Sequence, residues 1–159
     1  MKISLLLERE PFGKIFEESF TLFLNDFTKS QHKVKWHKKK LNIQNPISGQ
    51  IWYCNPLINS IFVKDANPAV FDSISGEYSH NPLRPWRSII QKLYLNFSKY
   101  KLTASLMAKY IIEVFPPIEN AESKLIVGGN TKIRLLDRDN NEVYVILKNG
   151  FDKKYLERE

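Results

Sequence analysis

The chain has 159 residues, and its 24 lysines and arginines outnumber its 17 aspartates and glutamates, giving a net charge of +7. With 43% apolar and 26% charged residues, it has the profile of neither a disordered nor a fibrous protein. Its one cysteine, Cys54, excludes an internal disulfide framework and favours a reducing, cytoplasmic compartment.

The first 63 residues predict a strand, a helix and further strands. The apolar run Ile3–Leu7 predicts a buried strand, and it is too short for a signal peptide or for a membrane span of about 20 residues. Aromatic and aliphatic residues then recur at helical spacing, which predicts an amphipathic helix over residues 11–27. A basic edge strand is expected from Lys33, and another strand over 50–54, whereas 57–63 suits either a strand or a helix.

Prolines interrupt residues 65–87, where we expect a long loop with one short helix near Val70. Helical periodicity over 86–97 and again over 102–115 predicts two antiparallel helices that end at Pro116 and Pro117. We place a linker at 116–123, because helical periodicity stops there and two-residue alternation begins. The predicted fold is therefore mixed α+β: a helix-rich N-terminal segment, 1–115, followed by a small antiparallel sheet from 124 onward.

The last third places a glycine loop and a lysine on one small sheet. Its order is a strand ending at Gly128, a polar loop, a second strand, a turn and a third strand ending at Lys148. Glycines allow positive φ and a close approach of the backbone, so the amides of Gly128, Gly129 and Asn130 are able to surround one anion. After the lysine, residues 156–159 have the composition of an opening helix without a cap or a stop, which suggests a truncated protein.

These residues resemble the N-terminal lobe of kinase-like phosphotransferases of the aminoglycoside and choline type. The match comprises Gly128-Gly129-Asn130-Thr131, the strand Val143–Lys148 and the helix opening that ends at Glu159. The resemblance implies that the loop covers the phosphates of ATP, that Lys148 contacts them, and that Glu159 or Glu157 pairs with Lys148. It also implies that a missing C-terminal lobe supplies the catalytic base and the magnesium ligands for transfer to a sugar or alcohol hydroxyl.

The same residues also suit a plain β-hairpin, in which the glycines make a bend and Lys148 ends a solvated strand. In that case the chain is a small basic binding protein that contacts a polyanion such as nucleic acid. Lys33–Lys40 would be its contact surface, with Trp36 as a stacking face, although a solvated edge strand explains the same residues.

Two further groups of residues complete the candidates. Arg84 and Arg87 lie on a proline-stiffened stretch that is either a ligand contact or a connector. His32 and His37 are surrounded by lysines, so we expect them to be exposed surface residues and predict no metal site.

Overall fold

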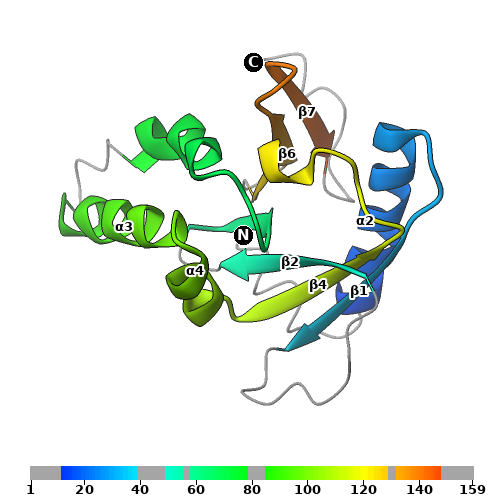
Figure 1. Ribbon diagram of the computed structural model, residues 1–159, viewed down its shortest axis with the longest axis horizontal. Coiled ribbons are helices and arrows are strands. Elements are labelled where there is room, and N and C mark those ends of the chain that lie inside the picture. The colour runs from blue at the N-terminus through cyan, green and yellow to red at the C-terminus, as the bar shows by residue number, and fades with distance from the viewer. Residues whose placement is uncertain (1–11, 39–48, 56–57, 79–84, 129–131, 148–159) are drawn as a thin grey trace.

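The computed structural model describes residues 12–38, 49–55, 58–78, 85–128 and 132–147. Among these residues, seven antiparallel strands form one sheet. Their order across the sheet is β1 (Lys33–Lys38), β4 (Tyr110–Phe115), β2 (Gln50–Asn55), β3 (Ser60–Val63), β5 (Lys124–Gly128), β6 (Lys132–Asp137) and β7 (Glu142–Leu147). One long helix lies on one face of this sheet, and a group of helices lies on the other (Figure 1). The fold is the mixed α+β architecture that the sequence predicts.

Helix α2 (Phe12–Thr28) covers the first face and confirms the predicted amphipathic helix. Its buried side chains Phe20 and Leu24 belong to one apolar core together with residues from most strands of the sheet. The buried part of this core comprises Phe20, Leu24, Val34, Trp52, Cys54, Ile61, Val63, Tyr110, Ile112, Val114, Ile118, Ala121, Ile126 and Leu135. Cys54 is part of it, and its burial raises the pKa of its thiol to about 12, so Cys54 is an unreactive core residue.

In the described part of the chain, three helices cover the second face. They are the 3-10 helix η1 (Pro68–Tyr78), which confirms the short helix expected near Val70, and the α-helices α3 (Pro85–Ser98) and α4 (Lys101–Met107). The core beneath them is made of Tyr53, Ile58, Phe62, Val70, Phe71, Ile74, Leu95, Ala104, Ala108, Ile111, Leu125 and Val127. The sheet is therefore covered on both faces.

The first four strands are β1 (Lys33–Lys38), β2 (Gln50–Asn55), β3 (Ser60–Val63) and β4 (Tyr110–Phe115). Strand β1 is at one edge of the sheet and pairs with β4, as the basic edge-strand prediction required. The segment 57–63, for which the sequence allowed either structure, contributes a strand.

The predicted second helix over 102–115 is wrong in its second half. Helix α4 ends at Met107, and the chain then enters β4 between β1 and β2. Apolar residues of β4 are buried on both faces of the sheet, with Ile111 on one and Ile112 on the other. A strand buried on both faces is a nearly continuous apolar run, and periodicity alone does not separate such a run from a buried helix.

The last strands are β5 (Lys124–Gly128), β6 (Lys132–Asp137) and β7 (Glu142–Leu147), preceded by the short 3-10 helix η2 (Ala121–Ser123). These are the three strands predicted for the last third. Because β5 pairs with β3, they continue the same sheet as the earlier strands. Residues 116–123, expected to link two units, connect β4 to β5 within that sheet.

The strand expected at Ile3–Leu7 and the helix expected from Leu156 lie outside the described residues. Within the described residues, no helix is both long enough and apolar enough to cross a membrane.

Candidate functional site

The last residues of β5 and β7 and the first residues of β6 lie at the same end of the sheet. This is the end at which the sequence predicts the glycine loop. Gly128 at the end of β5 lies opposite Ile133, and Lys132 at the start of β6 lies opposite Leu147 at the end of β7. The residue that follows β7 is Lys148. The register therefore brings the two strand ends that flank the glycine loop next to the strand end that precedes the lysine.

Gly128 itself is held by Asn59, the residue just before β3. The N–H of Gly128 donates to the carbonyl of Asn59 at an N···O distance of 2.9 Å, and the Asn59 side-chain amide donates to the carbonyl of Gly128. The expectation that the Gly128 amide faces an anion is therefore wrong, because a backbone N–H in a good hydrogen bond is not a free donor. Anion binding here requires the amides of the loop residues that follow.

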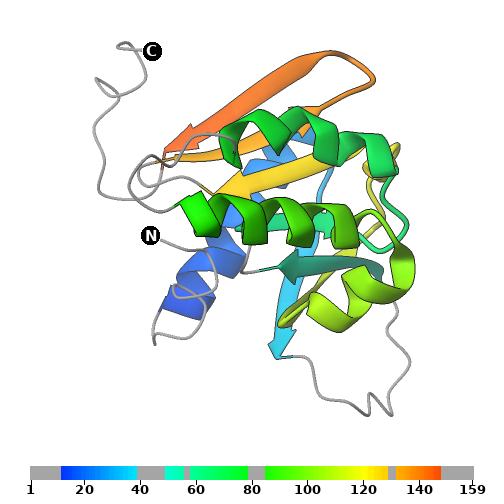
Figure 2. The same ribbon diagram turned by 90° about the vertical axis from the view of Figure 1, so that its left-hand side faces the viewer.

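The other predicted nucleotide contacts, Gly129, Asn130, Thr131, Lys148 and Glu159, lie outside the described residues, as does Arg84. Arg87 belongs to the first turn of α3, and its side chain is not described. Helix α3 begins on the same side of the molecule on which β5 and β7 end, at the left of Figure 2.

Two side chains near this end of the sheet were not singled out from the sequence. Asn59 has a positive φ of 48°, a conformation that asparagine adopts more readily than most residues. The Asn-Ser pair between two apolar runs is the sequence signal that indicates a turn at this position. Arg134 of β6 is half-buried and lies opposite Val127 and Val145. The alternation of apolar and polar residues in β6 does not indicate whether the Arg134 side chain is half-buried or fully exposed to solvent.

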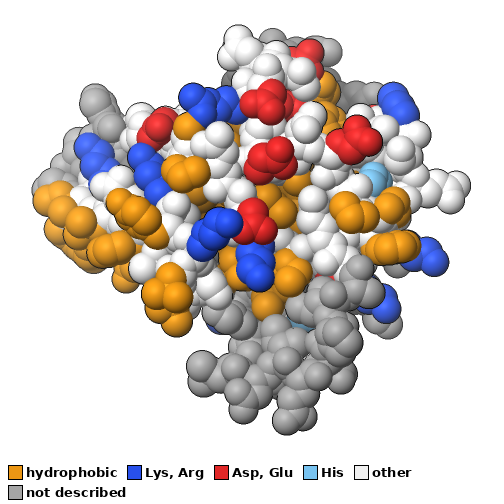
Figure 3. Space-filling view, viewed as in Figure 1, with side chains coloured by type: hydrophobic (Ala, Val, Ile, Leu, Met, Phe, Trp, Pro, Cys, Tyr) orange, Lys and Arg blue, Asp and Glu red, His pale blue; other side chains and the backbone are white. Residues whose placement is uncertain are grey.

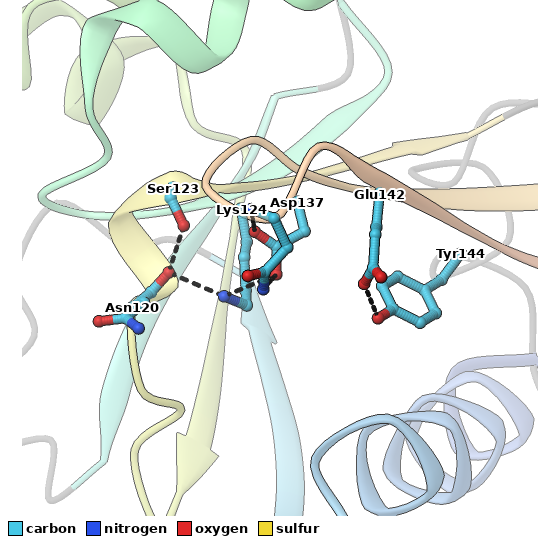
Figure 4. Close-up of polar contacts among 7 residues, drawn as sticks. Asn120, Ser123, Lys124, Asp137, Glu142 and Tyr144 are labelled. Atoms are coloured by element: carbon cyan, nitrogen blue, oxygen red, sulfur yellow. Dashed lines mark hydrogen bonds and ion pairs between the residues drawn. The ribbon is translucent and has the colours of Figure 1, made fainter.

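A buried ion pair lies at the opposite end of the same strands (Figure 4). The Nζ of Lys124 is 3.1 Å from Asp137 Oδ2, and it also donates to the backbone carbonyl of Asn120 at 3.1 Å. The Asn140 side-chain amide donates to the same carboxylate oxygen, Asp137 Oδ2, at an N···O distance of 3.0 Å. The ammonium lies 6.0 Å from the ring centroid of Phe27 on α2.

Both members of this pair are almost inaccessible, with Lys124 at 5% and Asp137 at 2% exposure. Burial raises the pKa of Asp137, but hydrogen bonds from Lys124 and Asn140 outweigh burial, so the net pKa is below the ordinary value. Both charged groups are thus satisfied by the protein. We interpret the pair as a structural tie between η2 and the β6–β7 turn.

The basic edge strand β1 has exposed lysines, but its tryptophan is not a stacking surface. Lys33, Lys35 and Lys38 are exposed, whereas Trp36 is half-buried and its ring meets that of Tyr110 edge-on at 5.6 Å. The period of two explains this, because Trp36 shares a face with the buried Val34 and points toward α2. The predicted base-stacking role of Trp36 is therefore contradicted.

The two histidines of the basic segment differ. His32 is buried, contrary to expectation, with Nε2 at 2.8 Å from Thr28 Oγ1 and Nδ1 at 2.8 Å from the carbonyl of Pro116. His37 is exposed and lies 3.5 Å from Glu113. Among the described residues, no group of three or more histidine, cysteine or acidic side chains is arranged to hold a metal ion.

Three polar features thus stand out in the described part of the chain. They are the strand ends around the glycine loop, the basic edge strand β1 and the Lys124–Asp137 pair. The chain matches no protein-family model, no curated protein and no solved structure.

Proposed function

We propose that residues 124–159 form the nucleotide-phosphate contact of an ATP-dependent phosphotransferase that acts on a sugar or alcohol hydroxyl. The observation that carries the proposal is the register of β5, β6 and β7, in which Gly128 and Leu147 reach the same end of the sheet. In such an arrangement a short glycine loop and the lysine after β7 can contact one polyphosphate. This is the arrangement that the resemblance to kinase-like phosphotransferases implies.

The hydrogen bonds to Asn59 refine this proposal. They anchor Gly128 on both its N–H and its C=O, so the phosphate contacts come from Gly129, Asn130 and Thr131 on an anchored base. Lys148 supplies the charge and Glu159 orients it, while magnesium binds together with ATP. Arg84 and Arg87 are proposed acceptor contacts, since α3 begins on this side of the molecule (Figure 2). We assign the activity to the cytoplasm, because a chain with one cysteine needs no oxidising compartment.

The test is calorimetric titration of the full 159-residue chain with MgATP, comparing wild type with Lys148→Ala. Hydrogen bonds to charged groups contribute roughly 1.5–3 kcal/mol, so Lys148→Ala should weaken binding by about tenfold or more. Lys35→Ala on β1 removes the same charge at the other edge of the sheet and should leave the affinity unchanged. Equal affinity of wild type and Lys148→Ala, or absence of MgATP binding by wild type, would contradict the proposal.

A second candidate function is polyanion binding by β1. The observation that favours it is the exposure of Lys33, Lys35 and Lys38 on an edge strand that carries no acidic residue. Because Trp36 packs inward, this binding would be electrostatic and would not depend on base identity.

Salt dependence tests the second candidate. The affinity for a labelled oligonucleotide should fall steeply with ionic strength, and the logarithmic slope should decrease by roughly 0.7–0.9 for each phosphate that is no longer neutralised by a lysine. The variant Lys33→Gln/Lys35→Gln should show this decrease. Lys64→Gln/Arg138→Gln has the same net charge and should not, so equal effects of the two variants would argue against a site on β1.

A further inference from the structure

Helix α3 turns its apolar stripe away from the core. Most of its large apolar residues recur every three or four positions, and they are exposed: Trp86 (57%), Ile89 (62%), Ile90 (40%), Leu93 (51%) and Phe97 (48%). The residues that face inward include the polar Ser88 and Ser98, with the buried Leu95 and the partly buried Tyr94 as apolar contacts. In a helix whose partner is the sheet alone, the apolar stripe would face the sheet.

Helix α4 extends this surface. Tyr100, Leu102 and Leu106 are between 67% and 76% exposed, and α4 packs beside α3. Figure 3 shows apolar side chains gathered over α3 and α4, with basic side chains beside them. We call these eight exposed residues, five from α3 and three from α4 and the turn before it, the apolar face. Contiguous exposed apolar surface of this kind on a folded domain marks a site of interaction.

The charges around the apolar face are mainly positive. Residues 85–112 include five lysines and arginines and no aspartate or glutamate. Lys99 and Lys101 pair with Asp72 and Asp65 from neighbouring segments, at 2.7 Å in each case. Positive charge remains in excess, since the exposed Lys92 and Lys109 belong to the same segment.

We propose that the apolar face docks on the surface of an anionic lipid bilayer. Tryptophan and tyrosine at the edge of an aliphatic surface, flanked by lysines, are the residues that interfacial segments place at the level of lipid headgroups. Anionic headgroups complement the excess of cations. A second copy of the chain is disfavoured as the occupant, because a symmetric contact would bring two copies of the same cationic segment together.

The apolar face on α3 and α4 is distinct from β1, whose exposed lysines lie on an edge strand that packs against α2. Binding through α3 and α4 should therefore depend on apolar side chains as well as on charge. It is also independent of nucleotide binding, so the two proposals can fail separately.

The test is co-flotation of the full chain with vesicles of phosphatidylcholine containing roughly one third phosphatidylserine. Wild type should float with these vesicles and much less with pure phosphatidylcholine. Ile89→Ser/Leu93→Ser should reduce binding about tenfold or more, because two aliphatic side chains no longer enter the interface. Leu22→Ser/Val143→Ser removes two other exposed apolar residues, on α2 and β7, and should bind like wild type.

Circular dichroism establishes that both double variants are folded, which is expected because all four positions are exposed. The proposal is overturned if wild type fails to float with anionic vesicles, or if Ile89→Ser/Leu93→Ser floats as well as wild type. It is also overturned if both double variants lose binding equally. A wild-type dimer that Ile89→Ser/Leu93→Ser converts to a monomer, without vesicle binding by either, would assign the face to a second copy.

Discussion

At the scale of single residues, the Lys124–Asp137 pair shows how this fold accommodates charge in its interior. A buried ion pair is costly to desolvate, and it persists where further hydrogen bonds satisfy both groups. The carbonyl of Asn120 and the amide of Asn140 meet that requirement. The sequence contains both charges, but residues 124 and 137 become neighbours only when β5 pairs with β6.

Removing one member of the pair should destabilise the protein strongly. Lys124→Ala leaves the Asp137 carboxylate buried without its cation, and we expect it to lower the free energy of unfolding by about 3–5 kcal/mol. Lys101→Ala breaks the exposed pair with Asp65 and should cost less than about 1 kcal/mol. Urea denaturation followed by circular dichroism measures both values, and similar decreases in the two variants would mean that Lys124 is not buried with its partner.

The pair also predicts a dependence of stability on acid. Because the pKa of Asp137 is lowered in the folded state, its stabilising contribution is present above the unfolded pKa of about 3.9 and is lost as pH falls through the folded pKa. The free energy of unfolding should therefore fall below about pH 4, and it should fall less steeply in Asp137→Asn. Asp26→Asn is the exposed control, and a steeper acid response in Asp137→Asn than in wild type would contradict the assignment.

At the scale of elements, α3 shows that periodicity locates a helix without orienting it. The spacing of Trp86, Ile89, Leu93 and Phe97 correctly predicts the helix, yet these residues face outward. The apolar stripe of a helix indicates what the helix needs to bury, and the tertiary structure decides whether the partner is the chain's own core.

Two neighbouring leucines of α3 test this orientation. Leu95 is 3% exposed and Leu93 is 51% exposed, so Leu95→Ala should cost about 2–4 kcal/mol of unfolding free energy. Leu93→Ala should change it by less than about 1 kcal/mol. Chemical denaturation of the two variants decides the matter, and a larger decrease in Leu93→Ala would mean that the apolar stripe packs inward.

At the scale of the whole molecule, the continuous sheet joins parts that the sequence suggests are separate. Strands β3 and β5 pair across the middle of the sheet, and Ile112 of β4 and Ile126 of β5 belong to one apolar core. Segments that unfold independently often coincide with supersecondary motifs that make few contacts with the rest of the protein. Here the sheet and the core both cross the expected boundary, so we expect one cooperative unit.

Hydrogen exchange tests this cooperativity. The amides of Ile112 and Ile126 should exchange through openings whose free energies agree within about 1 kcal/mol, because both open when the shared sheet unfolds. Exchange measured by NMR under native conditions gives both values. Ready exchange at Ile126 while Ile112 stays protected would instead indicate that β5–β7 unfold independently of the first four strands.

The sequence by itself determined the elements whose pattern is local: α2, the basic strand β1, the start of α3 and the three strands that follow residue 123. Each depends on side-chain period, prolines and turn residues, which act over a few positions. Of the candidate site, the sequence supplied the glycine loop and Lys148. Their predicted contacts with nucleotide stay predictions.

Only the tertiary structure decided the features that depend on pairing between distant segments. It made residues 110–115 a strand by placing them between β1 and β2, and it buried His32 against Pro116. It also occupied the amide of Gly128 with Asn59 and turned the apolar stripe of α3 outward. Local patterns do not specify these outcomes, because which neighbour a strand edge, an amide or an apolar stripe meets is settled by the packing of the whole chain.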